Sequence, residues 1–297
     1  MKILVIGSKG FIGSHCVNYF SKQYEVWGCD VVTDYNTINY FLVDSTNADY
    51  SEIFNQIKFD ICINCSGAAS VPDSIKNPQR DFILNTYNVF KQLDAIRKHS
   101  KNCKYINLSS AAVYGNPKSL PIGEEQGLKP ISPYGNHKKM AEDICEEFYN
   151  EFGILSCNLR IFSAYGPGLK KQLFWDLFRK FKSNHEIVLY GTGKESRDFI
   201  YISDLIQAIE CVIQKSNFNA EIVNVANGEE ITIEKMVNLF YAHLDSTTSY
   251  SFGGESRAGD PNNWKADITK LGKFGYSPRI DIEQGISNYI LWLKENK

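Results

Sequence analysis

Short apolar runs alternate with amphipathic stretches through the first half of the chain. The runs ILVIG, YEVWGCD, FDICINCS, KYINLSS and ILSCNLRIF, at residues 3–7, 24–30, 59–66, 104–110 and 154–162, predict strands that are mostly buried on both faces. Between two of them, residues 82–97 carry apolar side chains at helical spacing, namely Phe82, Val89, Phe90, Leu93 and Ile96. This alternation predicts right-handed βαβ units and a doubly wound parallel sheet covered by helices on both faces.

The pattern changes after about residue 163, where the alternation weakens and the loops lengthen. One later run, EIVNVANG at residues 221–228, again reads as a buried strand, so we expect the chain to return to the sheet there. The sequence therefore predicts an α/β protein with a second, smaller and discontinuous α/β domain. We expect the first domain to comprise residues 1–162 plus about 197–227, and the second to comprise 163–196 plus about 228–297.

Composition narrows the class of partner. The chain has 297 residues with 43% hydrophobic content, and 32 basic against 34 acidic side chains give a net charge of -2. There is thus no general cationic field for nucleic acid or anionic lipid, and we expect a small-molecule partner. The opening MKILVIG shows no basic leader, and no run approaches the roughly 18 apolar residues that span a bilayer. We expect a cytoplasmic protein that binds neither nucleic acid nor membrane.

Eight cysteines are scattered singly along the chain. Cys62 and Cys65 form a CxxC, but the pair lies inside an apolar run and no second pair completes a metal site. We interpret them as buried thiols of a strand and predict no metal.

The first strand leads into GSKGFIG, which places Gly7, Gly10 and Gly13 at GxxGxxG spacing. Glycines permit a tight turn and a close approach to a pyrophosphate, while the following helix supplies N–H donors at its amino end. Asp30 follows about 20 residues later, at the end of the second strand, where a carboxylate accepts ribose hydroxyls and repels a 2′-phosphate. Val31 and Val32 add no cation, so we predict a Rossmann-type site for NAD rather than NADP.

SPYGNHKKMAED, at residues 132–143, puts Tyr134 and Lys138 on one face of a predicted helix. A nearby ammonium stabilises a phenolate, so we expect Lys138 to lower the pKa of Tyr134. Ser110 ends an upstream strand in NLSSAAVYG, at the sheet edge where ligands bind, and could hydrogen-bond the same substrate oxygen. YxxxK alone would also fit a chance surface pair, but together with the glycine-rich turn it predicts a proton-transfer site.

At this point the chain resembles the extended short-chain dehydrogenase/reductases, and within them the NAD-dependent epimerase/dehydratase family that acts on nucleotide sugars. The resemblance covers nearly the whole chain. Its motifs occur in the family's order as GSKGFIGSH, INCSGAASVPDS, SSAAVYG, SPYGNHK, LRIFSAYGPG, YGTGKESRDFIYISDL, NVANGEEITI and RAGDPNNWKADITKL.

The resemblance implies roles for individual residues. It implies that Tyr134 is the general base, with Lys138 as its partner, also on the nicotinamide ribose, and Ser110 as the third catalytic member. The implied cofactor contacts are Gly7, Gly10, Phe11, Ile12, Gly13 and Asp30 on the pyrophosphate and ribose, Asp44 on the adenine, and Ser66 and Gly67 under the cofactor. Arg197 and Arg257 match arginines that grip a substrate diphosphate, although either could instead form a structural ion pair. Ser163 stands in the substrate segment where the family usually has Asn.

Two alanines bear on the reaction. Dehydratases of this family place an Asp-Glu pair after the active-site hydroxyl, and the related sugar-acid decarboxylases keep a glutamate there. This chain has Ala111 and Ala112, which transfer no proton. SSAAVYG most resembles the 4-epimerases, so we predict an NAD-dependent nucleotide-sugar epimerase acting at C4 through a transient 4-keto sugar. A 4-keto-sugar reductase and a silent dinucleotide-binding sensor remain alternatives.

The same resemblance implies a homodimer. Helices 82–97 and 134–152 carry apolar stripes, the second at Met140, Ile144, Phe148 and Phe152, and two such helices per subunit pair across a two-fold axis in the family. The alternative is that the stripes only cover the sheet.

Overall fold

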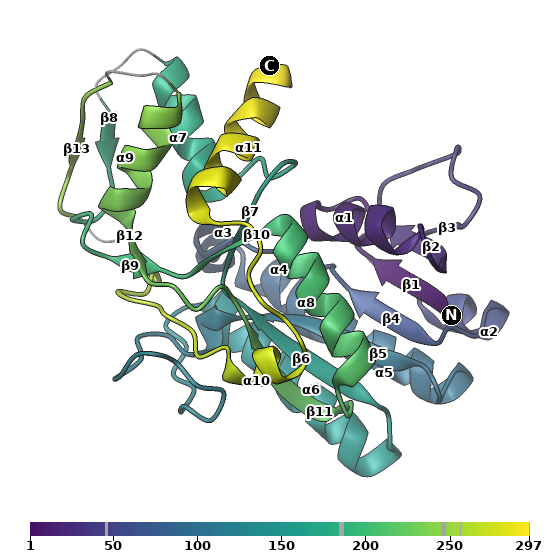
Figure 1. Cartoon of the computed structure of the whole chain (residues 1–297). Helices are drawn as coiled ribbons and strands as arrows, with labels where there is room; N and C mark the ends of the chain where they lie inside the picture. Colours follow the sequence, from purple (N-terminus) through teal and green to yellow (C-terminus); the bar gives the residue numbers. More distant parts are fainter. Residues whose placement is uncertain (45–46, 184–186, 245–247, 256, 297) are drawn as a thin grey trace.

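The computed structural model describes residues 1–44, 47–183, 187–244, 248–255 and 257–296. Its centre is a seven-stranded parallel sheet in the order β11-β6-β5-β4-β1-β2-β3 (Figure 1). The strands are β1 (Lys2–Ile6), β2 (Glu25–Asp30), β3 (Tyr40–Leu42), β4 (Ile61–Asn64), β5 (Lys104–Ser110), β6 (Ser156–Ile161) and β11 (Asn219–Val225). The predicted doubly wound parallel sheet is confirmed, including the late return of the chain to it at β11.

Helices cover both faces of the sheet, which explains why its strands read as continuous apolar runs. In β1, Ile3 and Val5 belong to the core on the side of α1 (Phe11–Phe20) and α8 (Ile202–Lys215). Leu4 and Ile6 point the other way, because successive side chains of a strand alternate between faces. Their core includes residues of α2 (Ser51–Gln56), α5 (Asn88–His99) and α6 (Pro133–Phe152).

The order of the strands reverses between β1 and β4, and such a switch point is where sheets of this kind bind ligands. The loops that leave the two strands are in close contact there. Gly7 has φ +79, and a Cβ on it would lie 2.7 Å from the carbonyl carbon of Cys65 and from the nitrogen of Ser66. A glycine is therefore required at this position by its backbone conformation and by the closeness of the neighbouring loop.

A second lobe stands at one end of the sheet (Figure 1). It contains α7 (Gln172–Lys182), α9 (Ile233–His243) and α11 (Ile282–Glu295), with three two-stranded sheets. These sheets pair β7 (Ser163–Tyr165) with β10 (Phe199–Tyr201), β8 (Ile187–Leu189) with β13 (Tyr250–Phe252), and β9 (Ser196–Arg197) with β12 (Ile231–Thr232). The late helix α10 (Thr269–Lys273) packs beside β11 instead. The domain boundaries stay a prediction.

The helix expected at 82–97 is not a regular α-helix. The chain forms α4 (Pro78–Phe82), then a π-helical turn (Ile83–Tyr87), and only then α5. A π turn carries one extra residue and shifts the side chains around it, which a search for regular helical spacing cannot detect. Two further short elements are the helix α3 (Val71–Lys76) and a 3₁₀ turn (Ala111–Val113) that follows β5. Across the described ranges, no helix combines the length and the apolar character that crossing a membrane requires.

Candidate active site

The amino end of α6 determines where Tyr134 lies. Ser132 caps the helix by accepting a hydrogen bond from the Gly135 amide at 3.1 Å, and Pro133 occupies the first helical position, where its missing N–H costs nothing. A Cβ on Gly135 would lie 2.6 Å from the carbonyl oxygen of Ala112, so only glycine lets the first turn approach this closely. The cap, the proline and the glycine together place the helix directly against the turn that follows β5.

The structure brings the three predicted catalytic residues together. Ser110 is the last residue of β5, and its hydroxyl lies close enough to the Tyr134 phenol to lower the pKa of that phenol. Lys138 lies one helical turn further on, with Nζ 6.0 Å from the centre of the Tyr134 ring. Both side chains are deeply buried, with exposed fractions of 9% for Tyr134 and 5% for Lys138. Lys138 donates a hydrogen bond to the carbonyl oxygen of Leu108 at 2.8 Å, which anchors the ammonium against the carboxyl-terminal part of β5.

The pKa of Tyr134 in this structure is raised, which is opposite to the direction expected from Lys138. Burial raises the pKa of Tyr134 to about 12, and the nearby Ser110 hydroxyl offsets only part of that rise. Burial lowers the pKa of Lys138 to about 8, although the charges of Asp81 and Glu142 favour its ammonium. The physical reason is that both groups leave water, which disfavours the charged form of each, and the ammonium is turned toward the Leu108 carbonyl.

The predicted cofactor residues gather at the switch point. Gly10 precedes α1, whose first turn comprises Phe11, Ile12 and Gly13, and an exposed helix amino end offers unpaired N–H donors. Asp30 ends β2 beside this turn, where its Oδ2 accepts the amide of Lys9 at 2.8 Å. Asp44 lies further out, exposed, and accepts the amide of Asn47 at 3.0 Å.

Two features of the glycine-rich loop fit a bound dinucleotide. The close packing at Gly7 leaves backbone rather than side chain at the switch point. The hydroxyl of Ser8 is buried and, among the residues that the structure describes, has no hydrogen-bond partner. A buried hydroxyl of this kind calls for a polar partner, which a phosphate oxygen would supply. The residues present therefore suit NAD.

The loop after β4 connects the cofactor side with the catalytic side. The amide of Ser66 and its hydroxyl donate to Asn64 Oδ1 at 3.1 and 2.5 Å, which holds the loop on the end of the strand. A Cβ on Gly67 would lie 3.6 Å from Lys138 Nζ and 2.5 Å from Asn85 Oδ1. Ser66, Gly67 and Lys138 are thus neighbours, as the predicted roles require.

Asn85 is a site residue that the sequence reasoning missed. It lies in the π turn, is 1% exposed, and its amide donates to Ala68 O and to Asp81 Oδ1, each at 3.0 Å. Its Oδ1 has no hydrogen-bond partner within the described ranges. The available signal was a polar residue four positions before Val89, on the apolar face of the expected helix.

Asp81 and His137 form a second pair that the sequence reasoning missed. Asp81 Oδ2 lies 2.6 Å from His137 Nδ1, and the carboxylate is 3% exposed. His137 directly precedes Lys138, and its carbonyl accepts the Thr86 hydroxyl at 2.8 Å. The pair therefore ties the catalytic turn of α6 to the helix that carries Asn85.

The predicted substrate arginines lie on the second lobe side. Arg197 donates to the carbonyls of Ser196 and Asn262 at 2.8 and 3.2 Å and lies over the Trp264 ring. Arg257 is exposed and lies over the Tyr190 ring at 4.7 Å. Burial raises the pKa of Asp260, and the charges of Arg257 and Arg197 oppose this rise, so both guanidinium groups lie near enough to act on this carboxyl.

Ser163 begins β7, where its amide donates to the carbonyl of Asp198 at 3.0 Å. It is partly buried next to the end of β6. This position joins the sheet to the second lobe, as expected for a residue of the substrate segment.

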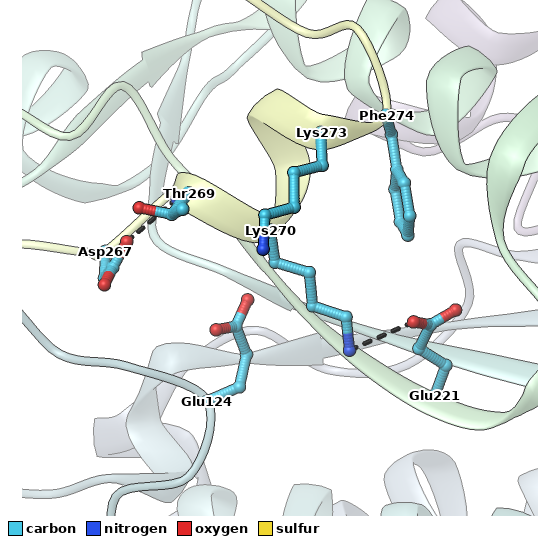
Figure 2. Close-up of a pocket in the computed structure, with 7 residues that line it drawn as sticks. All are labelled: Glu124, Glu221, Asp267, Thr269, Lys270, Lys273 and Phe274. Atoms are coloured by element: carbon cyan, nitrogen blue, oxygen red, sulfur yellow. Dashed lines mark hydrogen bonds and ion pairs between the residues drawn. The ribbon is translucent and has the colours of Figure 1, made fainter.

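Another hollow contains none of these residues. Figure 2 shows it beside β11, lined by Glu124, Glu221, Asp267, Thr269, Lys270, Lys273 and Phe274. Several of its charged groups are already engaged: Lys270 pairs with Glu221 at 3.1 Å, Glu124 accepts the amide of Asn224, and Asp267 accepts that of Thr269. We interpret it as a surface groove stabilised by its own contacts.

Comparison with known families gives a match over most of the chain. The pattern that defines the NAD dependent epimerase/dehydratase family matches residues 3–226. A curated relative, described as a putative UDP-glucose 4-epimerase of Methanocaldococcus jannaschii, is 29% identical and covers 99% of both chains.

Two solved structures are similar over the full length of this chain. One is the UDP-glucuronic acid 4-epimerase of Bacillus cereus in complex with UDP-glucuronic acid and NAD, with a TM-score of 0.91, 27% identity and complete coverage of both chains. The other is the UDP-N-acetylglucosamine 4-epimerase of Methanobrevibacter ruminantium, in complex with UDP-N-acetylmuramic acid. Its TM-score is 0.90 at 26% identity, covering 100% of this chain and 99% of the other.

Proposed function

We propose that this chain, which belongs to the NAD dependent epimerase/dehydratase family, is an epimerase that inverts C4 of a nucleotide sugar. The membership confirms the predicted family and NAD as the cofactor. The epimerase assignment agrees with the names of the similar proteins. The carbon, the sugar and the roles of single residues are proposals.

The observation that carries the proposal is the triad followed by two alanines. Ser110, Tyr134 and Lys138 converge at the carboxyl end of β5, beside the loop under the predicted cofactor. Ala111 and Ala112 occupy the next positions, and the carbonyl of Ala112 is packed against Gly135. No side-chain acid or base stands there to expel a hydroxyl or assist decarboxylation. A reversible transfer of one hydride and one proton is the chemistry that remains.

The steps balance without an external oxidant. Ser110 orients the C4 hydroxyl, and Tyr134 accepts its proton as the carbinol is oxidised. NAD, when bound, supplies the acceptor for the hydride. After the 4-keto sugar turns over, the hydride returns to the opposite face of C4 and Tyr134 returns the proton. Tyr134 must therefore enter the cycle as the phenolate, which the positive charge of Lys138 would favour, and it is a neutral phenol while the 4-keto sugar is bound.

The remaining residues bind and orient. We propose that Arg197 and Arg257 hold the substrate diphosphate, with Ser163 beside the sugar, because guanidinium groups bind phosphate oxygens in a bidentate manner. The proposed cofactor contacts are Gly7, Gly10, Phe11, Ile12, Gly13, Asp30, Asp44, Ser66 and Gly67, together with Tyr134 and Lys138.

The test incubates the purified protein with a panel of UDP-, GDP-, dTDP- and CDP-sugars and reads the sugar configuration by NMR. We expect interconversion of C4 epimers of at least one member with no added reductant, and none with Tyr134→Phe. Stoichiometric consumption of NADH or NADPH without epimer interconversion would identify a 4-keto-sugar reductase. Turnover of nothing in the panel would favour a sensor.

We also propose that the protein is a homodimer. Large apolar side chains are exposed on the face made by α4, the π turn, α5 and α6, namely Phe82, Tyr87, Phe90, Met140 and Phe152. Val89, Leu93 and Phe148 of the same helices are buried, so the stripes cover the sheet only in part. Light scattering should give twice the mass of the chain, whereas a monomeric mass at micromolar concentration would contradict the proposal.

The proposed location is the cytoplasm. All eight cysteines are free thiols, and most of them are buried. Unpaired thiols in this number suit a reducing compartment. Location of a tagged protein by fractionation tests this.

A further inference from the structure

The glycine-rich loop carries a cation that the sequence reasoning did not use. Lys9 lies between Ser8 and Gly10, and its amide donates to Asp30 Oδ2 at 2.8 Å. Its ammonium lies 5.1 Å from the centre of the Tyr40 ring, on the strand next to β2. A positive charge therefore stands near the carboxylate predicted to bind the adenosine ribose, although Val31 and Val32 supply none.

Asp34 holds this ammonium. Lys9 Nζ donates to Asp34 Oδ2 and forms an ion pair with it. Asp34 is fixed in turn, because it accepts the Thr37 hydroxyl at 2.6 Å and the amides of Asn36 and Thr37 at 2.8 and 3.2 Å. Its side chain is 14% exposed and that of Lys9 is 35% exposed. The loop after β2 is thus folded back onto the glycine-rich loop with its carboxylate on the lysine.

We infer that Asp34 is a determinant of cofactor specificity: by holding Lys9, it denies that ammonium to a 2′-phosphate and so favours NAD over NADP. The inference rests on the NAD site and does not depend on which sugar reaction follows.

Charge explains the direction of the effect. Asp30, Asp34 and Lys9 sum to one negative charge, which repels a phosphate that carries close to two. Without the carboxylate of Asp34 the sum is zero, and the ammonium is free to donate to the phosphate. Tyr40 does not supply a competing anion, because burial and the charges of Asp30, Cys29 and Asp34 raise the pKa of its phenol to about 12.

The test is a cycle of four proteins: the parent chain, Asp34→Asn, Lys9→Ala and the double variant. Calorimetry measures the binding of NAD and NADP to each at low ionic strength. We expect Asp34→Asn to increase the affinity for NADP about tenfold and to change the affinity for NAD by less than about threefold. Lys9→Ala alone should weaken NADP binding, because the summed charge falls to two negative, and the double variant should bind NADP about as the parent does. The gain should also shrink at high salt, since the new contact is partly exposed.

A matched control is Asp176→Asn, which breaks the exposed pair of Asp176 with Lys180 at 3.5 Å on α7. It should leave both affinities unchanged. Measuring the binding of ADP and of 2′,5′-ADP repeats the comparison with the adenosine half of the cofactor alone. Any change in affinity for the 2′-phosphate is then independent of the nicotinamide and of the sugar substrate.

Two results would overturn the inference. The first is an unchanged NADP affinity in Asp34→Asn while NAD still binds. The second is a gain in NADP affinity that persists when Lys9 is also removed, because the gain would then come only from losing the repulsion between Asp34 and the 2′-phosphate. Neither result bears on sugar epimerisation, and absence of epimerisation would not alter the binding cycle.

Discussion

Two ion pairs lie in different parts of the molecule, one beside the catalytic residues and one beside the predicted cofactor site. In the catalytic half, Glu142 of α6 pairs with Arg160 of β6 at 2.7 Å, and both side chains are 5% exposed. In the cofactor half, Lys9 pairs with Asp34 near the surface. The residue types are similar, but their surroundings are not.

The buried pair is the centre of a network. Glu142 also accepts the Ser109 hydroxyl at 2.5 Å, and Arg160 donates to the Tyr114 hydroxyl at 2.9 Å and to the Glu124 carbonyl at 3.0 Å. Glu142 lies one helical turn after Lys138, and Ser109 directly precedes Ser110. Breaking this pair leaves an unpaired buried charge beside the catalytic residues, so its loss is costly.

The surface pair has the opposite character. Lys9 is 35% exposed, so solvent can replace Asp34 as the partner of its ammonium, and the pair lies beside the carboxylate of Asp30. The difference teaches that the buried Glu142–Arg160 pair maintains structure, whereas the Lys9–Asp34 pair is the one that we infer to act on the ligand. The following predictions test that distinction.

Tyr134→Phe should have the largest effect. It removes only the phenolic oxygen, so turnover should fall by about 10²- to 10⁴-fold while NAD remains bound. Initial rates by NMR and NAD binding by calorimetry check both parts. Tyr149→Phe, further along the same helix, is the control and should retain activity; unimpaired turnover of Tyr134→Phe would rule out the proposed base. Removing Lys138 as well should cost much less than the sum of the two single losses.

Glu142→Ala should lower the free energy of unfolding by about 3 to 5 kcal/mol, because Arg160 stays buried without its partner. Urea titration followed by circular dichroism measures this. Replacing both residues by Met should recover much of the loss. A cost below about 1 kcal/mol would show that the buried pair does not maintain the fold.

Lys138→Met should make stability less dependent on pH. The folded-state pKa of Lys138 is about 8 and its ordinary value is 10.5, so folding must bury an ammonium below pH 8. That penalty, at most roughly 3 kcal/mol, fades as the pH rises from 8 to 10.5. The variant should therefore gain stability over the parent mainly at pH 7. Unfolding at pH 7 and pH 10 measures the difference, and a gain that is equal at both values would contradict this.

Asp30→Ala should weaken the binding of NAD about tenfold, because the ribose loses a charged acceptor. The difference between the affinities for NAD and NADP should therefore become smaller. Calorimetry with both cofactors gives the ratio. Asp60→Ala is a suitable control, since Asp60 accepts the Lys2 amide at the opposite end of the strands. If the parent protein binds NADP as tightly as it binds NAD, the assignment of Asp30 as the residue that favours NAD is refuted.

Asp34→Asn should have the smallest effect on the fold. Its unfolding midpoint in urea should fall much less than that of Glu142→Ala, because Lys9 is 35% exposed and the amide oxygen of asparagine still accepts hydrogen bonds. A midpoint that falls as far as that of Glu142→Ala would erase the contrast between the two halves.

The amino-acid sequence by itself determined the features that depend on near neighbours. Apolar runs predicted the strands of the central sheet except β3, the spacing of Gly7, Gly10 and Gly13 predicted the turn into α1, and four-residue spacing put Tyr134 and Lys138 on one face. These follow because turns, caps and helix faces depend on residues within a few positions of one another.

Only the tertiary structure decided which charges are buried and which groups they meet. Lys9 reaches Asp34 and the Asp30 carboxylate across more than 20 residues, and Glu142 meets Arg160 from a different element. Burial likewise reversed the expected direction of the Tyr134 pKa, because desolvation depends on everything packed around a group. Spacing along the chain carries no record of that packing, so charge states and long-range partners emerge only when the elements assemble.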